Sequence, residues 1–328
     1  MSVTLGYVGA LIVSHMTVSS TMLVLNKAVL AAIPLPTIVL LCQVGSSALI
    51  LWVLGKAKVL QVDALEWSTA KTFSLNALAF MALLFSNAKA LESANVEAVV
   101  VCRTMSIFVT AYGDFKVLKS KALDVPSMLA LGLVILGAVA YVMMDKGFVI
   151  NNMGWVFVYG LVNASYPIVT KLVIASKEMT SWGRTYYNNI MTFIVFLPLA
   201  FVLGEWSKAY HSYSQGTSFN MPAFTLLIGS CIWGTAISFL GFLVLANVSA
   251  TTFNLMGNTN KILTLAVNGM LWEKHASLQA NMGLLLSLLG AALYAEARRR
   301  QSAAEAAAKA NHQRVDVEMQ EESSEPSK

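Results

Sequence analysis

The chain has 328 residues, of which 57% are hydrophobic and only 12% are charged. A typical soluble domain has about 25% charged residues, so this composition excludes such a domain and predicts a membrane protein. The net charge of +5 does not indicate nucleic-acid binding, because the basic residues lie mostly at the ends of apolar stretches. The histidines and cysteines show no metal-ligand spacing. We therefore expect no metal, no cofactor and no disulfide.

Apolar stretches of about 20 residues, the length that a helix needs to cross a bilayer, follow one another along the chain. They predict ten transmembrane helices over residues 5–31, 36–55, 68–89, 95–116, 124–144, 151–176, 181–204, 222–246, 250–271 and 276–297. The connecting segments are short, so residues 1–300 are expected to form one membrane domain. Residues 301–328 begin with a short alanine-rich stretch and then become acidic and rich in Ser and Glu, which predicts a disordered tail.

The lysines and arginines predict the orientation of these helices. Twelve of them flank helix ends on one side of the membrane, among them Lys56, Lys177 and Arg298, and five flank the other side. The positive-inside rule assigns the larger group to the cytosol. Both termini, and with them the tail, are therefore expected to be cytosolic.

Two short motifs recur at a nearly constant distance. Ala94-Asn95-Val96 returns 152 residues later as Ala246-Asn247-Val248, and Gly137-Ala-Val-Ala-Tyr141 returns 153 residues later as Gly290-Ala-Ala-Leu-Tyr294. The spacing predicts two five-helix repeats, over about residues 5–144 and 151–297. Because five is odd, the second repeat must enter the membrane from the opposite side. The expected fold is therefore an all-α membrane protein of two inverted repeats, an arrangement that allows alternating access to a midplane site.

Two cations lie inside predicted membrane helices. Arg103 is on helix 95–116 and Lys261 on helix 250–271, which are counterparts in the repeat. Such a cation costs about 2.5–3.5 kcal/mol on insertion scales, so it normally faces a wet cavity. Together the two charges would suit a multiply charged anion such as a diphosphate. The alternatives are snorkelling or pairing with a carboxylate, but Asp114 lies about 16 Å beyond Arg103 along its helix.

Lys261 ends the polar run Gly257-Asn258-Thr259-Asn260-Lys261. A glycine lets a ligand or a helix approach the backbone closely, and the polar side chains after it could line a site. Further residues expected in the same wall are Ser238, Phe253 and Asn254. Asn163 is another candidate, although it could equally bond to carbonyls freed by the nearby Pro167.

A second polar run, Tyr186-Tyr187-Asn188-Asn189, interrupts helix 181–204. The two amides offer the donors and acceptors that could bind the edge of a purine, particularly guanine, and the tyrosines could stack on a base or bond to a ribose or phosphate. The alternative is that the asparagines bond across to other helices as structural links. Successive residues are 100° apart on a helix, so the four cannot all face one cavity.

These motifs resemble those of the nucleotide-sugar transporters in the drug/metabolite transporter superfamily, and in particular the GDP-sugar branch typified by GDP-mannose transporters. That branch has an FYNN motif, matched by residues 186–189, and a GALNK motif, matched by residues 257–261. The resemblance extends over all ten helices and includes Asn26-Lys27 and Arg103-Thr104. It implies that Asn188 and Asn189 bind guanine, while Asn260 and Lys261 hold the sugar and the diphosphate. It also implies that Arg103 adds charge at the phosphates and that Ser238 and Phe253 line the pocket.

The same resemblance implies an antiporter that exchanges cytosolic GDP-sugar for lumenal GMP in the Golgi membrane. GDP-mannose is the first expectation for the sugar. GDP-fucose and GDP-L-galactose follow closely, because Asn258-Thr259 replaces the Ala-Leu of the motif beside the sugar and the region around Glu273 looks closer to plant-type carriers.

Other functions stay open at this stage. A UDP-sugar or sugar-phosphate carrier of the same fold is the main alternative, and a non-transporting polytopic membrane protein is a more distant one. No acid–base pair or nucleophile arrangement occurs in the predicted spans, so we expect no enzyme and no catalytic residue. The expected partners are GDP-sugar, GMP and the lipid bilayer, with a homodimer left open.

Overall fold

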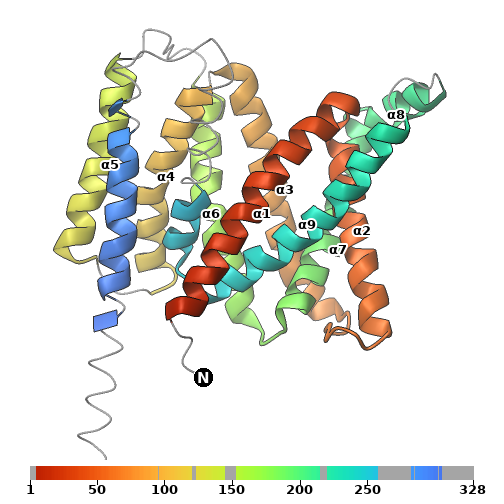
Figure 1. The fold of residues 1–328 in the computed structure, drawn as a ribbon, viewed down its shortest axis with the longest axis horizontal. Coiled ribbons are helices and arrows are strands. Elements are labelled where there is room, and N and C mark those ends of the chain that lie inside the picture. Colours follow the sequence, from red (N-terminus) through yellow and green to blue (C-terminus); the bar gives the residue numbers. More distant parts are fainter. Residues whose placement is uncertain are drawn as a thin grey trace, which may run out of the picture. The chain divides into compact units, whose positions relative to one another are not determined.

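A computed structural model describes residues 5–94, 96–119, 123–144, 153–214, 220–257, 282–283, 285–301 and 303–304. Within these residues the chain is helical, and the helices are shown in Figure 1. They are α1 (Leu5–Ala32), α2 (Pro36–Lys56), α3 (Trp67–Ser93), α4 (Val96–Lys116), α5 (Val125–Met144), α6 (Gly154–Ser176), α7 (Ser181–Val202), α8 (Glu205–Ser214) and α9 (Met221–Asn247). Residues 250–257 and 285–301 are also helical.

Most predicted spans coincide with observed helices, within four residues at either end, from α1 to α7 and at α9. Six helices in the described part of the chain are long and apolar enough to cross a membrane, and residues Val125–Tyr141 of α5 form a shorter apolar helix. Helix α4 has the length of a span but carries Glu97, Arg103 and Asp114. The spans predicted over 250–271 and 276–297 lie partly outside the described residues, so the number of ten helices stays a prediction.

Helix α8 was not predicted, because its ten residues are too few to cross a membrane. Its first residue, Glu205, is buried. One carboxylate oxygen accepts hydrogen bonds from the backbone N–H groups of Thr37 at 2.9 Å and Ile38 at 3.0 Å, and the other accepts from the Thr37 hydroxyl at 2.9 Å. These N–H groups belong to the first turn of α2 and have no partner inside that helix. Glu205 therefore caps α2.

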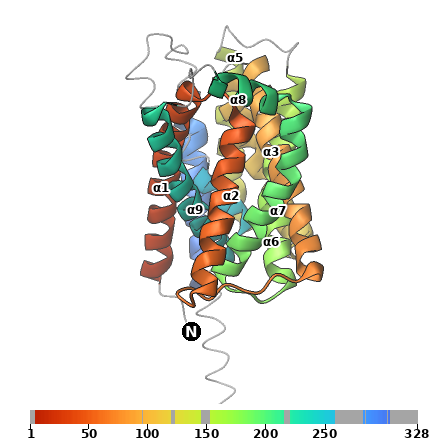
Figure 2. The same cartoon turned by 90° about the vertical axis from the view of Figure 1, so that its right-hand side faces the viewer.

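A second carboxylate caps α7 indirectly, by holding the N-cap residue whose hydroxyl accepts from the backbone N–H of Gly183. Asp63, in the loop between α2 and α3, accepts a hydrogen bond at 3.0 Å from the backbone N–H of Thr180, which is the N-cap residue of α7. The Tyr187 hydroxyl also bonds to this loop, because it accepts a hydrogen bond from the backbone N–H of Glu66 at 2.6 Å. Figure 2 shows α2 beside α7, with α8 at the end where α2 begins. The two helices are thus antiparallel, and each is capped by a carboxylate that follows the other in sequence.

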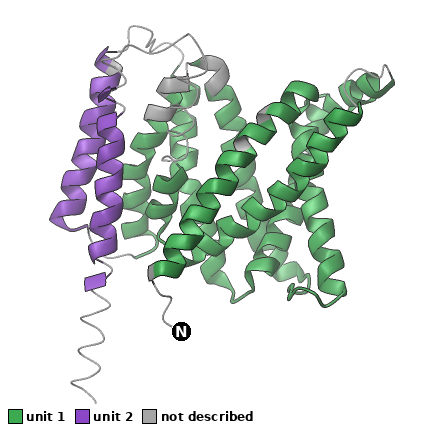
Figure 3. Cartoon of the chain, in the orientation of Figure 1, with its two compact units in different colours: residues 1–120, 147–275 green, residues 121–146, 276–328 purple. Residues whose placement is uncertain are grey.

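The chain packs into two compact units, which Figure 3 distinguishes by colour. Residues 1–120 and 147–275 form the first unit, whose core includes buried side chains of α1, α2, α3, α7 and α9, such as Val29, Phe73 and Phe196. Residues 121–146 and 276–328 form the second unit. Each unit contains residues of both predicted repeats, so this grouping does not test the division into residues 5–144 and 151–297.

In the second unit, the glycine that begins each copy of the repeated Gly–Tyr motif packs against the helix that carries the other copy. A Cβ atom on Gly137 would lie 2.3 Å from the backbone nitrogen of Ser287, and one on Gly290 would lie 2.7 Å from that of Val134. Only glycine permits so close an approach of α5 and helical residues 285–301. The first residue of the motif therefore has the same packing role in both copies, as an internal repeat would require.

Candidate functional site

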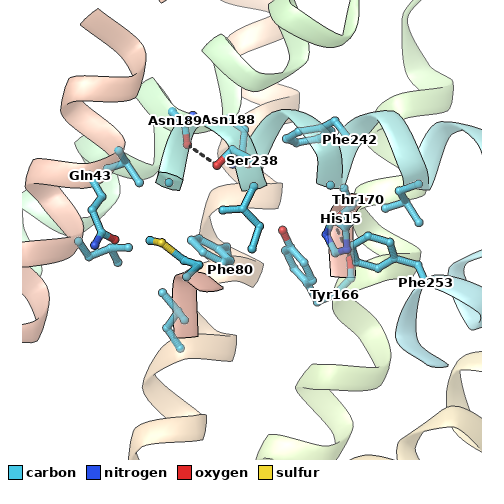
Figure 4. A pocket seen from close by; sticks show the side chains of 18 of the residues that line it. His15, Gln43, Phe80, Tyr166, Thr170, Asn188, Asn189, Ser238, Phe242 and Phe253 are labelled. Atoms are coloured by element: carbon cyan, nitrogen blue, oxygen red, sulfur yellow. Dashed lines mark hydrogen bonds between the residues drawn. The ribbon is translucent and has the colours of Figure 1, made fainter. Parts of the chain in front are cut away.

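A cavity of about 290 Å³ lies inside the first unit, among α1, α2, α3, α6, α7 and α9. Figure 4 shows it from close by. Its wall is mostly apolar with a few polar groups, which is the usual composition of a ligand site. The lining residues are His15, Met22, Asn26, Leu40, Gln43, Val44, Phe80, Leu84, Tyr166, Thr170, Asn188, Asn189, Gly234, Ile237, Ser238, Gly241, Phe242, Leu245 and Phe253.

Four of the predicted site residues lie in this wall, namely Asn188, Asn189, Ser238 and Phe253. Asn189 donates a hydrogen bond from Nδ2 to the Ser47 hydroxyl at 2.7 Å, and its Oδ1 accepts from the Ser238 hydroxyl at 3.5 Å. The second of these bonds is drawn in Figure 4. The Asn189 side chain therefore connects α2, α7 and α9 at the edge of the cavity.

The Asn188 amide is oriented by a chain of polar side chains. Its Oδ1 accepts a hydrogen bond from Asn76 Nδ2 at 2.6 Å, and Asn76 Oδ1 accepts one from the Thr170 hydroxyl at 2.7 Å. These bonds connect α7 to α3 and α6. The Asn188 Nδ2 group forms no hydrogen bond with any described residue, so both of its protons can be donated to a ligand.

The two tyrosines of the same motif do not line the cavity, contrary to the sequence-based prediction. Tyr187 is buried behind the wall, where its hydroxyl accepts from Glu66 and donates to the backbone carbonyl of Ala64. The Tyr186 ring packs edge-on against it, with the ring centroids 6.2 Å apart. The rotation of 100° per residue accounts for the difference, because a helix that turns its asparagines inward turns Tyr187 toward the loop.

Asn163 and Asn254 also lie outside the cavity wall and bond to each other instead. Asn163 Nδ2 donates to Asn254 Oδ1 at 3.1 Å and to the Ser106 hydroxyl at 2.7 Å, while Asn254 Nδ2 donates to the Thr110 hydroxyl at 2.7 Å. Both amides are therefore occupied by a network that joins α4, α6 and residues 250–257. This arrangement favours the alternative role, a structural link between helices.

Arg103 lies against the start of the second polar motif. Its Nη1 donates to the Tyr159 hydroxyl at 3.0 Å, and a Cβ atom on Gly257 would lie only 2.9 Å from its Nη2. The missing side chain of Gly257 thus makes room for the guanidinium group rather than for another helix. Arg103 does not line the cavity, but Phe253, one turn before Gly257, does. Residues 250–257 therefore connect the cavity wall to Arg103.

Asp114, further along the same helix as Arg103, is bonded to another element. Asp114 accepts hydrogen bonds from the backbone N–H of Thr251, at 2.7 Å, and from the Thr251 hydroxyl. It therefore caps the helix over residues 250–257. The rest of the second motif, Asn258, Thr259, Asn260 and Lys261, lies outside the described residues. The expected meeting of the Arg103 and Lys261 charges stays a prediction.

Sequence reasoning did not assign several polar lining residues to the site. Gln43 donates to Asn26 Oδ1 at 2.9 Å and to the Ser230 hydroxyl at 3.0 Å, and the His15 ring packs 5.5 Å from the Phe253 ring. A polar residue inside an apolar stretch was a usable signal for His15 and Gln43. Tyr166 and Phe80 gave no such signal, because aromatic residues are common in any membrane helix.

Apolar helices of spanning length, arranged around a cavity with a few directed amides, are typical of a polytopic membrane protein with a candidate site for a polar ligand. The chain belongs to the Triose-phosphate Transporter family, whose model matches residues 7–295. It is therefore a member of a transporter family and not of an enzyme family.

The chain is similar to "GDP-fucose transporter 1" of Arabidopsis thaliana, with 29% identity over 87% of this chain and 84% of the relative. It is 30% identical to "GDP-mannose transporter GONST3" of the same plant, over 84% of this chain and 74% of the relative. The "UDP-sugar transporter sqv-7" of Caenorhabditis elegans is 23% identical over 77% of this chain and 76% of the relative. The resemblance to the GDP-sugar branch of the nucleotide-sugar transporters is thereby confirmed.

A solved structure described only as "Crystal structure of protein" has a TM-score of 0.61 to this chain and 13% identity, and the match covers 91% of this chain and 99% of the other. At this identity the similarity shows the fold alone.

Proposed function

We propose that the chain is a GDP-sugar antiporter of the Golgi membrane that exchanges cytosolic GDP-sugar for lumenal GMP by alternating access. GDP-mannose is the first candidate for the sugar, followed by GDP-fucose and GDP-L-galactose. Relatives named as transporters of GDP-fucose and of GDP-mannose support a GDP-sugar substrate. Both termini would be cytosolic, with ten membrane helices, a disordered tail over residues 301–328 and a homodimer as one assembly to test.

The observation that carries this proposal is the pair of amides in the cavity wall. Asn76 holds the carbonyl oxygen of Asn188 at 2.6 Å, which leaves the Asn188 NH2 group as a donor. Guanine presents O6 and N7 as hydrogen-bond acceptors for this NH2 group. It also presents N–H groups, and Asn189 Oδ1 could accept a hydrogen bond from one of them. Uracil and cytosine are smaller and present a different order of donors and acceptors, so a guanosine ligand fits these two amides better.

The charge for the phosphates would come from Arg103 together with Lys261. Arg103 lies beside Gly257, one helical turn beyond the cavity-lining Phe253. A diphosphate bound between guanine at Asn188 and a sugar near residues 257–261 would therefore pass close to the guanidinium group. Arginine suits this position because its planar group can donate two parallel hydrogen bonds to a phosphate.

Alternating access is supported by the two reciprocal helix caps. Helix α2 belongs to the first predicted repeat and α7 to the second. Each is the second helix of its repeat. Asp63 follows α2 and caps α7, whereas Glu205 follows α7 and caps α2. This exchange is what two inverted copies of one unit would produce, and such copies can rock about a central site.

Counterflow in proteoliposomes tests the proposal. Vesicles that contain the purified protein are loaded with GMP or with UMP, and uptake of labelled GDP-mannose, GDP-fucose, GDP-L-galactose and a UDP-sugar is measured. We expect internal GMP to drive uptake of a GDP-sugar, and Lys261→Ala to abolish it in folded protein. Near-normal exchange by Lys261→Ala would contradict the charge assignment.

A UDP-sugar carrier is the second candidate, because a relative named as a UDP-sugar transporter also matches most of the chain. Uptake driven by UMP and not by GMP would favour it and would overturn the guanine assignment.

A further inference from the structure

The cavity has a polar position that guanine binding does not use. His15, near the middle of α1, lines the wall and is only 9% exposed. Figure 4 shows its ring beside that of Phe253, on a different part of the wall from Asn189 and Ser238. We propose that His15 is a specificity-determining residue that donates a hydrogen bond from Nε2 to a phosphate oxygen of the carried nucleotide. This inference rests on the proposed nucleotide-transport function.

The surroundings of the two ring nitrogens decide which one carries the proton. Nδ1 is buried and has no hydrogen-bond partner in the described part of the chain. A neutral imidazole has one N–H group, and a proton on Nδ1 would leave that donor buried and unsatisfied. The tautomer with the proton on Nε2 instead leaves Nδ1 as an acceptor that is unpaired among the described residues, and places the N–H group on the nitrogen that lies beside the cavity-lining Gly241. Protonation of both nitrogens would again place an unpaired N–H donor on the buried Nδ1, so the neutral form of the imidazole fits the site.

Nε2 faces the part of the wall formed by Gly241. A Cβ atom on Gly241 would lie 3.9 Å from Nε2, and no other atom of a neighbouring described helix lies within 4 Å of that position. Gly241 also lines the cavity, and Nε2 forms no hydrogen bond with the described residues. The Nε2–H group is therefore a donor that has space beside it for a ligand atom.

The position of His15 along the cavity indicates which ligand atom it would meet. Its ring packs 5.5 Å from that of Phe253, and one turn beyond Phe253 the backbone of Gly257 lies against Arg103. The imidazole is thus on the side of the cavity that leads to the guanidinium group, away from the amide that would hold guanine. A phosphate oxygen is the acceptor expected there, and a neutral donor binds it without adding to the fixed charge of the site.

The test compares ligands that differ only in the phosphate. Affinities for GMP and for guanosine are measured by calorimetry on the full-length protein in detergent. His15→Phe keeps a ring but removes the donor, His15→Gln restores an N–H donor, and His211→Phe on the exposed face of α8 is the matched control. We expect His15→Phe to weaken GMP binding about three- to tenfold, the range for one hydrogen bond, and to leave guanosine binding unchanged. His15→Gln should recover part of the loss.

Other outcomes would overturn the proposal. GMP affinity that is unchanged in His15→Phe, or equal losses for GMP and guanosine, would mean that His15 only packs against Phe253. If His15→Phe does not fold, the variant Gly241→Ala tests the inference instead. Its added methyl group would make ordinary contact with Nε2 and occupy the space of the phosphate oxygen. It should weaken GMP and not guanosine, and a GMP affinity equal to that of the wild type would reject the inference. Wild-type protein that binds UMP but neither guanosine ligand would instead reject the proposed function itself.

Discussion

Two pairs of buried asparagines in this protein have similar surroundings and different roles. Asn163 and Asn254 are each 5% exposed, while Asn188 and Asn189 are 6% and 1% exposed, so burial does not separate the pairs. The difference lies in their hydrogen-bond partners. The first pair bonds to itself and to hydroxyl groups of α4, whereas the second pair is held by neighbouring helices at the edge of a cavity.

The comparison shows how to separate a binding amide from a structural one in a membrane helix. Asn254 accepts a hydrogen bond at Oδ1 from Asn163 and donates one from Nδ2 to Thr110, so both of its polar groups are used inside the bundle. An amide held by its acceptor alone, as Asn188 is by Asn76, keeps its NH2 donors for a ligand. Four variants, one of them a double substitution, test this comparison.

The largest effect is expected from the cavity pair. In the double variant Asn188→Ala and Asn189→Ala, the affinity for GMP should fall about 100-fold, because two directed amides are lost from the base-binding site. Equilibrium binding of GMP, with elution volume in gel filtration as the check of folding, measures this. An equal loss of affinity for a uridine ligand would contradict the assignment to guanine.

The structural pair should respond in the opposite way. Asn254→Leu should lower the free energy of unfolding by about 1–2 kcal/mol, because Asn163, Ser106 and Thr110 lose a shared partner inside the bundle. The affinity of the remaining folded protein for GMP should not change. Thermal unfolding in detergent measures the loss, with Asn247→Leu at the exposed end of α9 as the matched control. A large loss of GMP affinity at unchanged stability would return Asn254 to the binding site.

A smaller effect is expected from the residue that orients Asn188. Asn76→Leu removes the donor at 2.6 Å from Asn188 Oδ1 and should weaken GMP binding about fivefold, since the Asn188 amide loses its fixed orientation. The control is Ser74→Ala on the same helix, which removes a hydroxyl bonded to the carbonyl of Ala70. GMP affinities that are equal in these two variants would show that the orientation of Asn188 does not matter for binding.

The smallest effect is expected at an exposed pair outside the spans. A hydrogen bond from Lys177 lowers the pKa of Glu66, and the same bond raises the pKa of Lys177. The pair therefore contributes stability that is lost when the pH falls through the lowered pKa of Glu66, or rises through the raised pKa of Lys177. Exposed pairs contribute little, in contrast to the buried amides.

The measurement for this pair is the difference in Tm between wild type and Glu66→Gln. It should be small and positive at pH 7 and should decrease toward zero as the pH falls through the lowered pKa of Glu66. A difference that persists unchanged at low pH would mean that Glu66 acts through something other than its charge.

The amino-acid sequence was enough to predict the helices from α1 to α7 and α9, because spanning length and apolar composition are local properties of each segment. The two polar runs also indicated the family. Of the residues predicted for the site, Asn188, Asn189, Ser238 and Phe253 line the cavity, and their role in binding stays a prediction. Asn258, Thr259, Asn260 and Lys261 keep the role that the family resemblance gives them, as a prediction.

Which polar residues face the cavity depends on how the helices pack, and the sequence did not predict this. The rotation of each helix about its axis turned Tyr187 toward a loop and His15 inward, and the packing of residues 250–257 near α6 joined Asn254 to Asn163. The reciprocal caps from Asp63 and Glu205 depend on helices that lie far apart in sequence and side by side in space. A hydrogen bond of this kind is fixed by where its partner lies, and no single segment contains that information.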